Sequence, residues 1–497
     1  MGKNSDESSR ITSGIPGLDD VLTGGLPRNT LLLIEGRPGS GKTTIALQFL
    51  LQGVREGETC LLVTNAESAR QLDWIAASHG WSLEGIHVSE WREPTQTEDD
   101  GGLDYTLFPE AEVEVGETLQ YLYAEVERVQ PTLLVIDTIS ALRVLAPTPA
   151  FYRRQLRRIR EFLSTRSCTT FILDDGSTGE KDARSQTLAD GIIELQQVDF
   201  NYGMDRRRLR VRKLRGSTYV SGAHDFSITT GGIVLYPRLV ARAHDKGVAL
   251  EPLSSTIAEL DRLSGGGLPR GTSTLMIGPA GTGKSTLATV YAMAAADRGE
   301  KSCILLLDEG IETHVARSRG LGLDVDAAME ADSIRIQELN AAELSPGQIA
   351  HLVVRQVEED GVGLVVIDTL NGYLHSAMEE PTVLLHLREL IAYLGRRGVV
   401  TLLTLTQHGI LGPAMLTPMD VSFLADNVFL LRYFEESGGI RQALSMVKKR
   451  TGRHERTIRE LVLAPGRVSL GPPLREFSGI LTGTPHYSGS NLPATGA

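Results

Sequence analysis

The chain has 497 residues, 41% of them hydrophobic and 23% charged, a composition typical of a folded protein long enough for two domains. Its formal net charge of −12 argues against a nonspecific nucleic-acid or membrane binder, because such proteins present basic surfaces. The three cysteines lack metal-ligand spacing, and no apolar run approaches the roughly 20 residues of a membrane helix, so we expect a cytoplasmic protein with buried thiols.

The first predicted strand, residues 31–35, leads into a glycine-rich loop and a helix. The loop fits G-x-x-x-x-G-K-[ST], in which backbone N–H groups surround phosphates, the lysine reaches the β- and γ-phosphates, and the hydroxyl residue holds Mg²⁺. We therefore expect a nucleoside triphosphate with Mg²⁺ on Gly36, Gly39, Ser40, Gly41, Lys42, Thr43 and Thr44.

Further strands are predicted at residues 60–64, 133–137, 170–174 and 191–196. Asp137 ends one of them and can hold the Mg²⁺ water shell beside Thr43, although a capping aspartate is the alternative. Glu67 follows the strand 60–64 and can orient the nucleophile, although a glutamate at a helix start is the alternative. The stretch 98–117 is strongly acidic and reads as a solvated loop or a partner-docking surface.

Lys213 and Arg215 are two residues apart, so on a strand both would point to the same side. They lie far from their own P-loop in sequence, and no target for them in their own subunit is evident. Two readings are open, a phosphate contact supplied to a neighbouring subunit and plain surface charge.

The second half repeats the first. Lys284 lies 242 positions after Lys42, and strands are predicted at residues 274–278, 303–307, 363–368, 399–404 and 427–433. The same chemistry is expected of the loop residues Gly278, Gly281, Thr282, Gly283, Lys284, Ser285 and Thr286, of Asp368 for Mg²⁺, of Glu309 after the second strand, and of the late pair Lys448 and Arg450.

Alternation of strands and helices in each half predicts an α/β fold, two tandem P-loop domains with mainly parallel sheets flanked by helices. The expected division is a flexible arm at 1–10, a first domain at 11–237, a linker at 238–253, a second domain at 254–480 and a disordered tail at 481–497.

These motifs together resemble the KaiC family of RecA-like ATPases, over nearly everything from residue 11 to about 483. The second half also carries the family's K-x-R-x-x-x-H segment as Lys448, Arg450 and His454. The resemblance implies a double-ring homohexamer in signalling, with ATP and Mg²⁺ at subunit interfaces, the neighbour's Lys/Arg pair on the γ-phosphate, slow ATP hydrolysis and Ser/Thr autophosphorylation in the second ring. A signalling protein partner also follows from it.

Two departures from the family pattern affect function. The family has two adjacent glutamates after the second strand, and we align Ala66-Glu67 and Glu309-Gly310 with them. The position of the base is then Ala66 in the first half and Glu309 in the second, which puts hydrolysis in the first half in doubt. The phosphorylation pair falls on Ser422-Phe423, so Ser422 is the expected acceptor and Thr417 the alternative.

Two other classes remain open. One is a RecA- or RadA-like DNA-binding ATPase, for which the basic run 206–213 is the candidate surface, against the acidic balance of the chain. The other is an ATP-gated scaffold without kinase activity. Radiolabel from γ-labelled ATP separates a kinase from a scaffold, because only the kinase labels itself.

Overall fold

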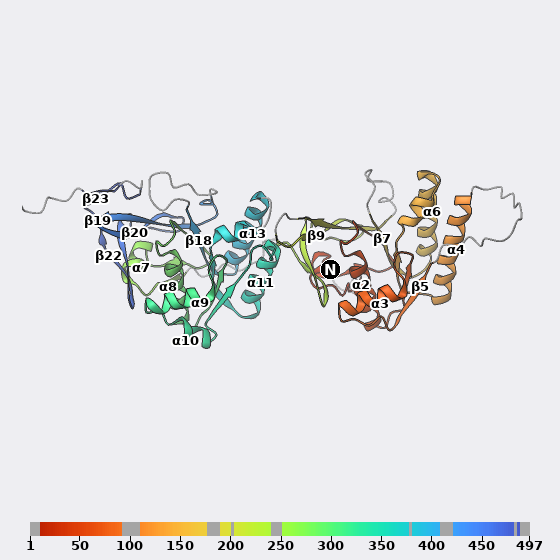
Figure 1. Ribbon diagram of the computed structural model, residues 1–497, viewed down its shortest axis with the longest axis horizontal. Helices are drawn as coiled ribbons and strands as arrows, with labels where there is room; N and C mark the ends of the chain where they lie inside the picture. Colours follow the sequence, from red (N-terminus) through yellow and green to blue (C-terminus); the bar gives the residue numbers. More distant parts are fainter. Residues whose placement is uncertain are drawn as a thin grey trace, which may run out of the picture. The chain divides into compact units, whose positions relative to one another are not determined.

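The computed structural model describes residues 10–91, 110–175, 189–199, 203–239, 251–376, 380–407, 421–481 and 485–487. The chain divides into two compact units, Met1–Arg238 and Leu239–Ala497 (Figure 1). In each unit a nine-stranded sheet carries helices on both faces. The predicted α/β class with two tandem, mainly parallel domains is confirmed.

In the first unit the strand order is β11-β10-β9-β8-β3-β7-β6-β4-β5, and the strands from β8 to β5 run parallel. The sheet strands are β3 (Leu31–Gly36), β4 (Cys60–Thr64), β5 (Ile86–Glu90), β6 (Leu133–Asp137), β7 (Thr169–Asp174), β8 (Gly191–Val198), β9 (Arg206–Leu214), β10 (His224–Thr229) and β11 (Gly232–Tyr236). A two-stranded ribbon adds β1 (Arg10–Ile11) and β2 (Leu26–Pro27).

Two apolar cores lie on opposite faces of this sheet, because alternate residues of β3 belong to different cores: Leu32 and Ile34 to one, Leu33 to the other. The first face carries α1 (Leu18–Val21), α2 (Lys42–Arg55) and α3 (Ala69–Ser78), and the second carries α4 (Glu110–Val129), α5 (Ser140–Leu145) and α6 (Pro149–Ser164). Since α4 begins at Glu110, the reading of 98–117 as a loop is wrong for its last residues, and residues 98–109 lie outside the described ranges.

The second unit has the same plan, with strand order β16-β15-β17-β18-β14-β19-β20-β21-β22 and an antiparallel extension after β19. Its strands are β14 (Ser273–Gly278), β15 (Lys301–Leu306), β16 (Ile334–Glu338), β17 (Val362–Asp368), β18 (Val400–Thr406), β19 (Asn427–Glu436), β20 (Gly439–Lys449), β21 (Ile458–Ala464) and β22 (Arg467–Pro473). Short ribbons pair β12 (Pro252–Leu253) with β13 (Leu268–Pro269), and β23 (Phe477–Ser478) with β24 (His486–Tyr487).

One face of this sheet packs against α7 (Ala258–Ser264), α8 (Lys284–Ala296), α9 (Ile311–Gly320) and α10 (Val325–Glu330), the other against α11 (Pro346–Glu359), α12 (Leu370–Leu374) and α13 (Glu380–Arg396). Local sequence explains several helix starts: Ser68 and Ser345 form capping boxes with the glutamine three residues later. The short strand β24 contradicts the expectation of disorder for residues 486–487 of the tail.

All three cysteines are buried and unpaired, as predicted. In the part of the chain that the structure describes, no helix combines the length and the apolar character needed to cross a bilayer.

Candidate functional site

Each P-loop joins the parallel strand at the centre of its sheet to a helix on one face, β3 to α2 and β14 to α8. The glycine before each lysine adopts a left-handed conformation, with φ of 100° at Gly41 and 97° at Gly283. A side chain there would be strained, and at Gly41 its Cβ would lie 2.9 Å from Cδ1 of Ile228. Both helices therefore begin with free backbone N–H groups at a glycine turn, the arrangement that receives phosphate.

The two P-loop lysines fold back onto their own loops. Lys42 Nζ donates to the carbonyl oxygens of Gly36 (2.9 Å) and Arg37 (3.2 Å). Lys284 Nζ donates to those of Gly278 (3.0 Å) and Pro279 (2.7 Å). Burial lowers the pKa of Lys284 to about 8, against the opposing attraction of Asp368. In both loops the ammonium group is bonded to carbonyl oxygens of the loop. When a nucleotide binds, its phosphate oxygens would accept these hydrogen bonds instead.

In the first domain, Thr43 Oγ1 donates to Asp137 Oδ2 at 3.1 Å, which brings together the two residues expected to hold Mg²⁺. Burial raises the pKa of Asp137 to about 6, although Thr43 and Lys42 oppose the shift. Asp175, the residue after β7, forms an ion pair with Lys42 at 2.9 Å and was not singled out from the sequence. A carboxylate and a hydroxyl of this kind suit the oxygen-ligand preference of Mg²⁺.

In the second domain, Thr404 Oγ1 donates to Asp368 Oδ1 at 2.5 Å, so this buried aspartate is also oriented by a hydroxyl group. Ser285 lies in the first turn of α8, and its carbonyl accepts a hydrogen bond from Thr289 Oγ1 at 2.8 Å. Lys284, Ser285 and Asp368 lie at the carboxyl ends of the parallel strands of the second sheet. Their counterparts lie at the equivalent place in the first sheet.

Backbone hydrogen bonds fix which residues correspond between the domains. The amide after the second strand donates to the carbonyl of the strand-ending aspartate in both, from Asn65 to Asp137 (2.9 Å) and from Leu307 to Asp368 (2.7 Å). Thr64 is paired with Asp137, and Leu306 with Asp368. Asn65 therefore corresponds to Leu307, which differs by one residue from the alignment of the two sequences given above.

This register overturns the assignment of the carboxylates. Glu67 corresponds to Glu309, because the next residues, Ser68 and Gly310, are the N-caps of α3 and α9. The pairing of Glu309 with Ala66 is wrong. Both domains keep the same glutamate, Glu67 and Glu309, but the first domain still has Ala66 at the position aligned with the base, so the prediction of doubtful hydrolysis there is unchanged.

The residue that corresponds to Ala66 is Asp308, and the sequence analysis did not single it out. Its carboxylate accepts a short hydrogen bond from Thr369 Oγ1, beside Asp368. The second domain thus presents two adjacent carboxylates, Asp308 and Glu309, where the first presents only Glu67. Either carboxylate can orient or deprotonate a hydroxyl nucleophile.

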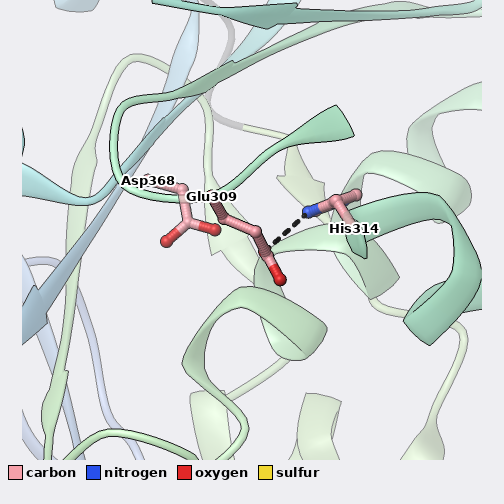
Figure 2. Close-up of side chains that lie close together, drawn as sticks. All are labelled: Glu309, His314 and Asp368. Atoms are coloured by element: carbon pink, nitrogen blue, oxygen red, sulfur yellow. Dashed lines mark ion pairs between the residues drawn. The ribbon is translucent and has the colours of Figure 1, made fainter. Parts of the chain in front are cut away.

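Glu309 lies in a compact group with Asp368 and His314, whose ligand atoms are all within 4.8 Å of one another (Figure 2). His314 Nδ1 is 3.7 Å from Glu309 Oε2, the approach that the dashed line marks in Figure 2. Arg317 forms an ion pair with the other oxygen of Glu309. Burial and the charge of Arg317 lower the pKa of His314 more strongly than the nearby carboxylates raise it. The group places the Glu309 carboxylate, which Arg317 holds, beside Asp368, the residue expected to hold Mg²⁺.

The late Lys/Arg pairs occupy equivalent positions. Each lysine is the second-last residue of the strand next to the parallel part of the sheet, after a bulge of one residue. Lys213 Nζ donates to the carbonyl of Ala189 at 2.7 Å, and Arg215 approaches Asp190 at 3.5 Å. Burial is the main cause that lowers the pKa of Lys213.

In the second domain, Lys448 Nζ donates to the carbonyl oxygens of Ser422 and Ala425, both at 2.9 Å, and Arg450 pairs with Asp426 at 3.2 Å. The expectation that these cations have no target in their own subunit is therefore wrong. His454 follows in the irregular segment between β20 and β21.

Strand register places these pairs at the edge of the sheet opposite their own P-loop. Asn427 is the partner of both Lys449 and Thr274, whereas the P-loop begins at the other end of β14, at Gly278. Four residues of strand separate the two ends, about 13 Å at ~3.3 Å per residue. The first domain has the same register, because Gly191 is the partner of both Leu214 and Leu32, whereas its P-loop begins at Gly36. The pair therefore lies at the end of the parallel strands that is away from its own P-loop.

Ser422 is exposed in the turn before β19, at this same edge and beside Lys448. The adjacent Phe423 has 50% of its surface exposed. Thr417, the alternative acceptor, lies outside the described residues.

The basic run 206–213 forms β9 inside the sheet, between β8 and β10. Arg206 is buried, Arg208 approaches Asp225 at 3.5 Å, and Arg212 pairs with Glu194. Ion pairs within the sheet leave this run a poor track for a nucleic-acid backbone.

Comparisons with known proteins identify the family of the chain. A family model described as "ATPase: KaiC" matches residues 11–240 and 253–474. The chain is 26% identical over 504 residues to circadian clock protein KaiC3 of Synechocystis sp., covering 98% of this chain and 97% of that protein. It is 29% identical over 501 residues to circadian clock protein KaiC2 of the same organism, covering 97% and 85%. It is 26% identical over 498 residues to the circadian clock oscillator protein KaiC of Picosynechococcus sp., covering 96% and 92%. The resemblance predicted from the motifs, with two tandem RecA-like domains, is confirmed.

Proposed function

Since the chain belongs to the KaiC family of ATPases, we propose that it hydrolyses ATP as a ring of six copies and that its second domain phosphorylates Ser422 of the neighbouring copy. In this proposal ATP is held with Mg²⁺ between the P-loop of one copy and the Lys/Arg pair of the next. The phosphorylation state then signals to a protein partner.

The observation that carries the proposal is the separation of the two halves of each site. The P-loop and the Lys/Arg pair lie at opposite edges of one sheet, about 13 Å apart along the strands at ~3.3 Å per residue. A head-to-tail ring brings these two edges together, because it repeats the same unlike contact around the circle. A cation supplied by a neighbour is a known way to stabilise phosphoryl transfer.

Ser422 lies at the same end of the sheet as Lys448 and Arg450. Its carbonyl accepts from Lys448, so a pair that reaches a neighbour's γ-phosphate brings the Ser422 hydroxyl to the same place. In the transfer, Ser422 Oγ bonds to the γ-phosphorus, the bond from that phosphorus to the β,γ-bridging oxygen breaks, and ADP leaves. The serine proton passes to Asp308 or Glu309 of the copy that holds ATP. Mg²⁺, held through Ser285 and Asp368, supplies positive charge for the leaving oxygens.

We expect intact-mass spectrometry after incubation with Mg-ATP to show one added phosphate per chain, mapped to Ser422. Ser422→Ala removes most of this signal, whereas the control Ser437→Ala, an exposed serine in the turn at the far end of β19, retains it. Phosphate that persists undiminished in Ser422→Ala assigns the acceptor elsewhere, with Thr417 as the first site to examine. No added phosphate in the parent protein leaves the ATP-gated scaffold as the function.

A further inference from the structure

A chain of polar contacts runs behind Glu309 in the second domain. Arg317 Nη1 pairs with Glu309 Oε1, and Arg317 Nη2 lies 3.1 Å from His314 Nδ1. His314 Nε2 lies 3.2 Å from Thr289 Oγ1, which donates to the carbonyl of Ser285 at 2.8 Å. We refer to Glu309, Arg317, His314 and Thr289 as the Glu309 network.

The chemistry of the donors fixes the direction of every bond. A guanidinium only donates, so His314 Nδ1 accepts and carries no proton. The neutral ring then has its proton on Nε2 and donates to Thr289, whose own proton goes to the carbonyl of Ser285. His314 and Thr289 are fully buried, while 32% of the Arg317 side chain is exposed. Since Nδ1 is occupied by Arg317, this histidine is a spacer that orients the arginine and is poorly placed to ligate a metal ion.

The network ties the carboxylate to the P-loop helix. On α8, Ser285 directly follows Lys284 and Thr289 lies one turn after Ser285, whereas His314 and Arg317 lie three residues apart on one side of α9. Glu309 precedes α9 in the loop after β15. The position of this carboxylate is thus set by two helices together, with Oε1 bonded to Arg317 and Oε2 3.7 Å from His314 Nδ1 (Figure 2).

The described residues of the first domain form no such network at the corresponding positions. By the offset of 242 residues that relates Glu67 to Glu309, the counterparts of Thr289, His314 and Arg317 are Leu47, Leu72 and Ile75. Leu47 and Leu72 are buried in one apolar core, and Ile75 packs against it. Equivalent backbone positions therefore carry apolar core side chains in the first domain and hydrogen-bonded polar side chains in the second.

We propose that Arg317 is a positioning residue for Glu309 and sets the rate of phosphoryl transfer in the second domain alone. The inference rests on the proposed function of this site. Phosphoryl transfer passes through a loose transition state in which orientation of the nucleophile matters more than proton removal. An arginine that holds one oxygen of Glu309 fixes where the other oxygen points, and the contact of Arg317 Nη2 with His314 Nδ1 holds the arginine itself.

The test uses a Glu67→Gln background, so that phosphate release reports the second domain. We expect Arg317→Met to lower kcat about 10- to 100-fold, the cost of a misplaced reacting group, with KM for ATP changed less than about twofold. Arg317→Lys falls between, because an ammonium group cannot span both partners. Arg319→Met is the matched control: Arg319 lies on the same helix but pairs with Asp326, and its loss leaves kcat unchanged.

A double-mutant comparison distinguishes positioning from a structural role. If Arg317 acts through Glu309, Arg317→Met has no further effect on kcat in a Glu309→Gln background, because the two changes remove one unit. An equal loss of kcat in both backgrounds, or no loss in the parent, overturns the inference. Should Arg317→Met fail to fold, the triple change Thr289→Leu, His314→Leu and Arg317→Ile, which installs the first domain's residues, takes its place with the same expectations. A Glu67→Gln parent that neither releases phosphate nor labels itself overturns the proposed function instead, and the inference with it.

Discussion

Mixing two inactive variants tests the shared ATP site most directly. Lys284→Ala removes the P-loop lysine of the second domain, and Arg450→Ala removes a cation at the opposite edge of the same sheet. Each variant alone has a defect at every interface of a homogeneous ring, so each labels itself poorly. In a mixed ring, an interface is intact wherever an Arg450→Ala copy supplies the P-loop and a Lys284→Ala copy supplies the arginine.

The expected recovery follows from this geometry. In a random equal mixture, half of the copies carry an intact P-loop and half of their neighbours carry an intact arginine, so about one quarter of the interfaces are intact. This fraction does not depend on the number of copies in a closed ring. If the lysine and the arginine served the same nucleotide within one chain, no copy would hold both, and recovery would be zero.

The assay also identifies which copy receives the phosphate. Ser422 lies beside Lys448, so it accompanies the arginine and not the P-loop. With a size tag on one variant and γ-labelled ATP, label should appear on the Lys284→Ala copies, although their own second P-loop is damaged. Subunit exchange is verified with fluorescent pairs. Label confined to Arg450→Ala copies, or no gain over the separate variants once exchange is complete, would refute the shared site.

Two further outcomes are expected. ATP bound between copies stabilises the assembly by linkage, about 2.7 kcal/mol per site at 100 times the dissociation constant, so Lys42→Ala should lose ATP-dependent assembly measured by light scattering, and unchanged assembly would contradict this. His224 is buried, and burial lowers its pKa from 6.5. The unfolded state then binds more protons, so the first domain loses stability as pH falls through about 6.5 and keeps it above. Urea unfolding followed by tryptophan fluorescence reports this domain selectively, because Trp74, Trp81 and Trp91 all belong to it, and a His224→Gln variant with the same pH dependence would contradict the cause.

The features that the sequence predicted best are those that a few adjacent residues determine. A P-loop needs glycine at the left-handed turn before its lysine, so Gly41 and Gly283 identify it without any knowledge of distant contacts. Asp137 and Asp368 were equally easy to predict. Each ends an apolar run, and the end of such a run must lie at the carboxyl ends of a parallel sheet.

Register was harder to predict, and the glutamates show why. Residues 60–63 and 303–306 are both uninterrupted apolar runs headed by cysteine, and they invite an alignment by matching letters. Strands buried on both faces have no alternation of polar and apolar residues to reveal a shift of one position. The offset of 242 residues between Lys42 and Lys284 also relates Glu67 to Glu309, and the hydrogen bonds to Asp137 and Asp368 confirm this register.

The Glu309 network shows a different limit. His314 and Arg317 are three residues apart on a helix, which places them on one side, but nothing local says that this side faces a carboxylate five residues earlier. The corresponding Leu72 and Ile75 satisfy the helix pattern equally well as core residues. The backbone that positions phosphate, Mg²⁺ and a carboxylate is therefore common to the two domains, whereas the side chains that surround the carboxylate differ. Equal P-loops do not imply equal rates, because in phosphoryl transfer the rate depends on how firmly the groups around the γ-phosphate are held.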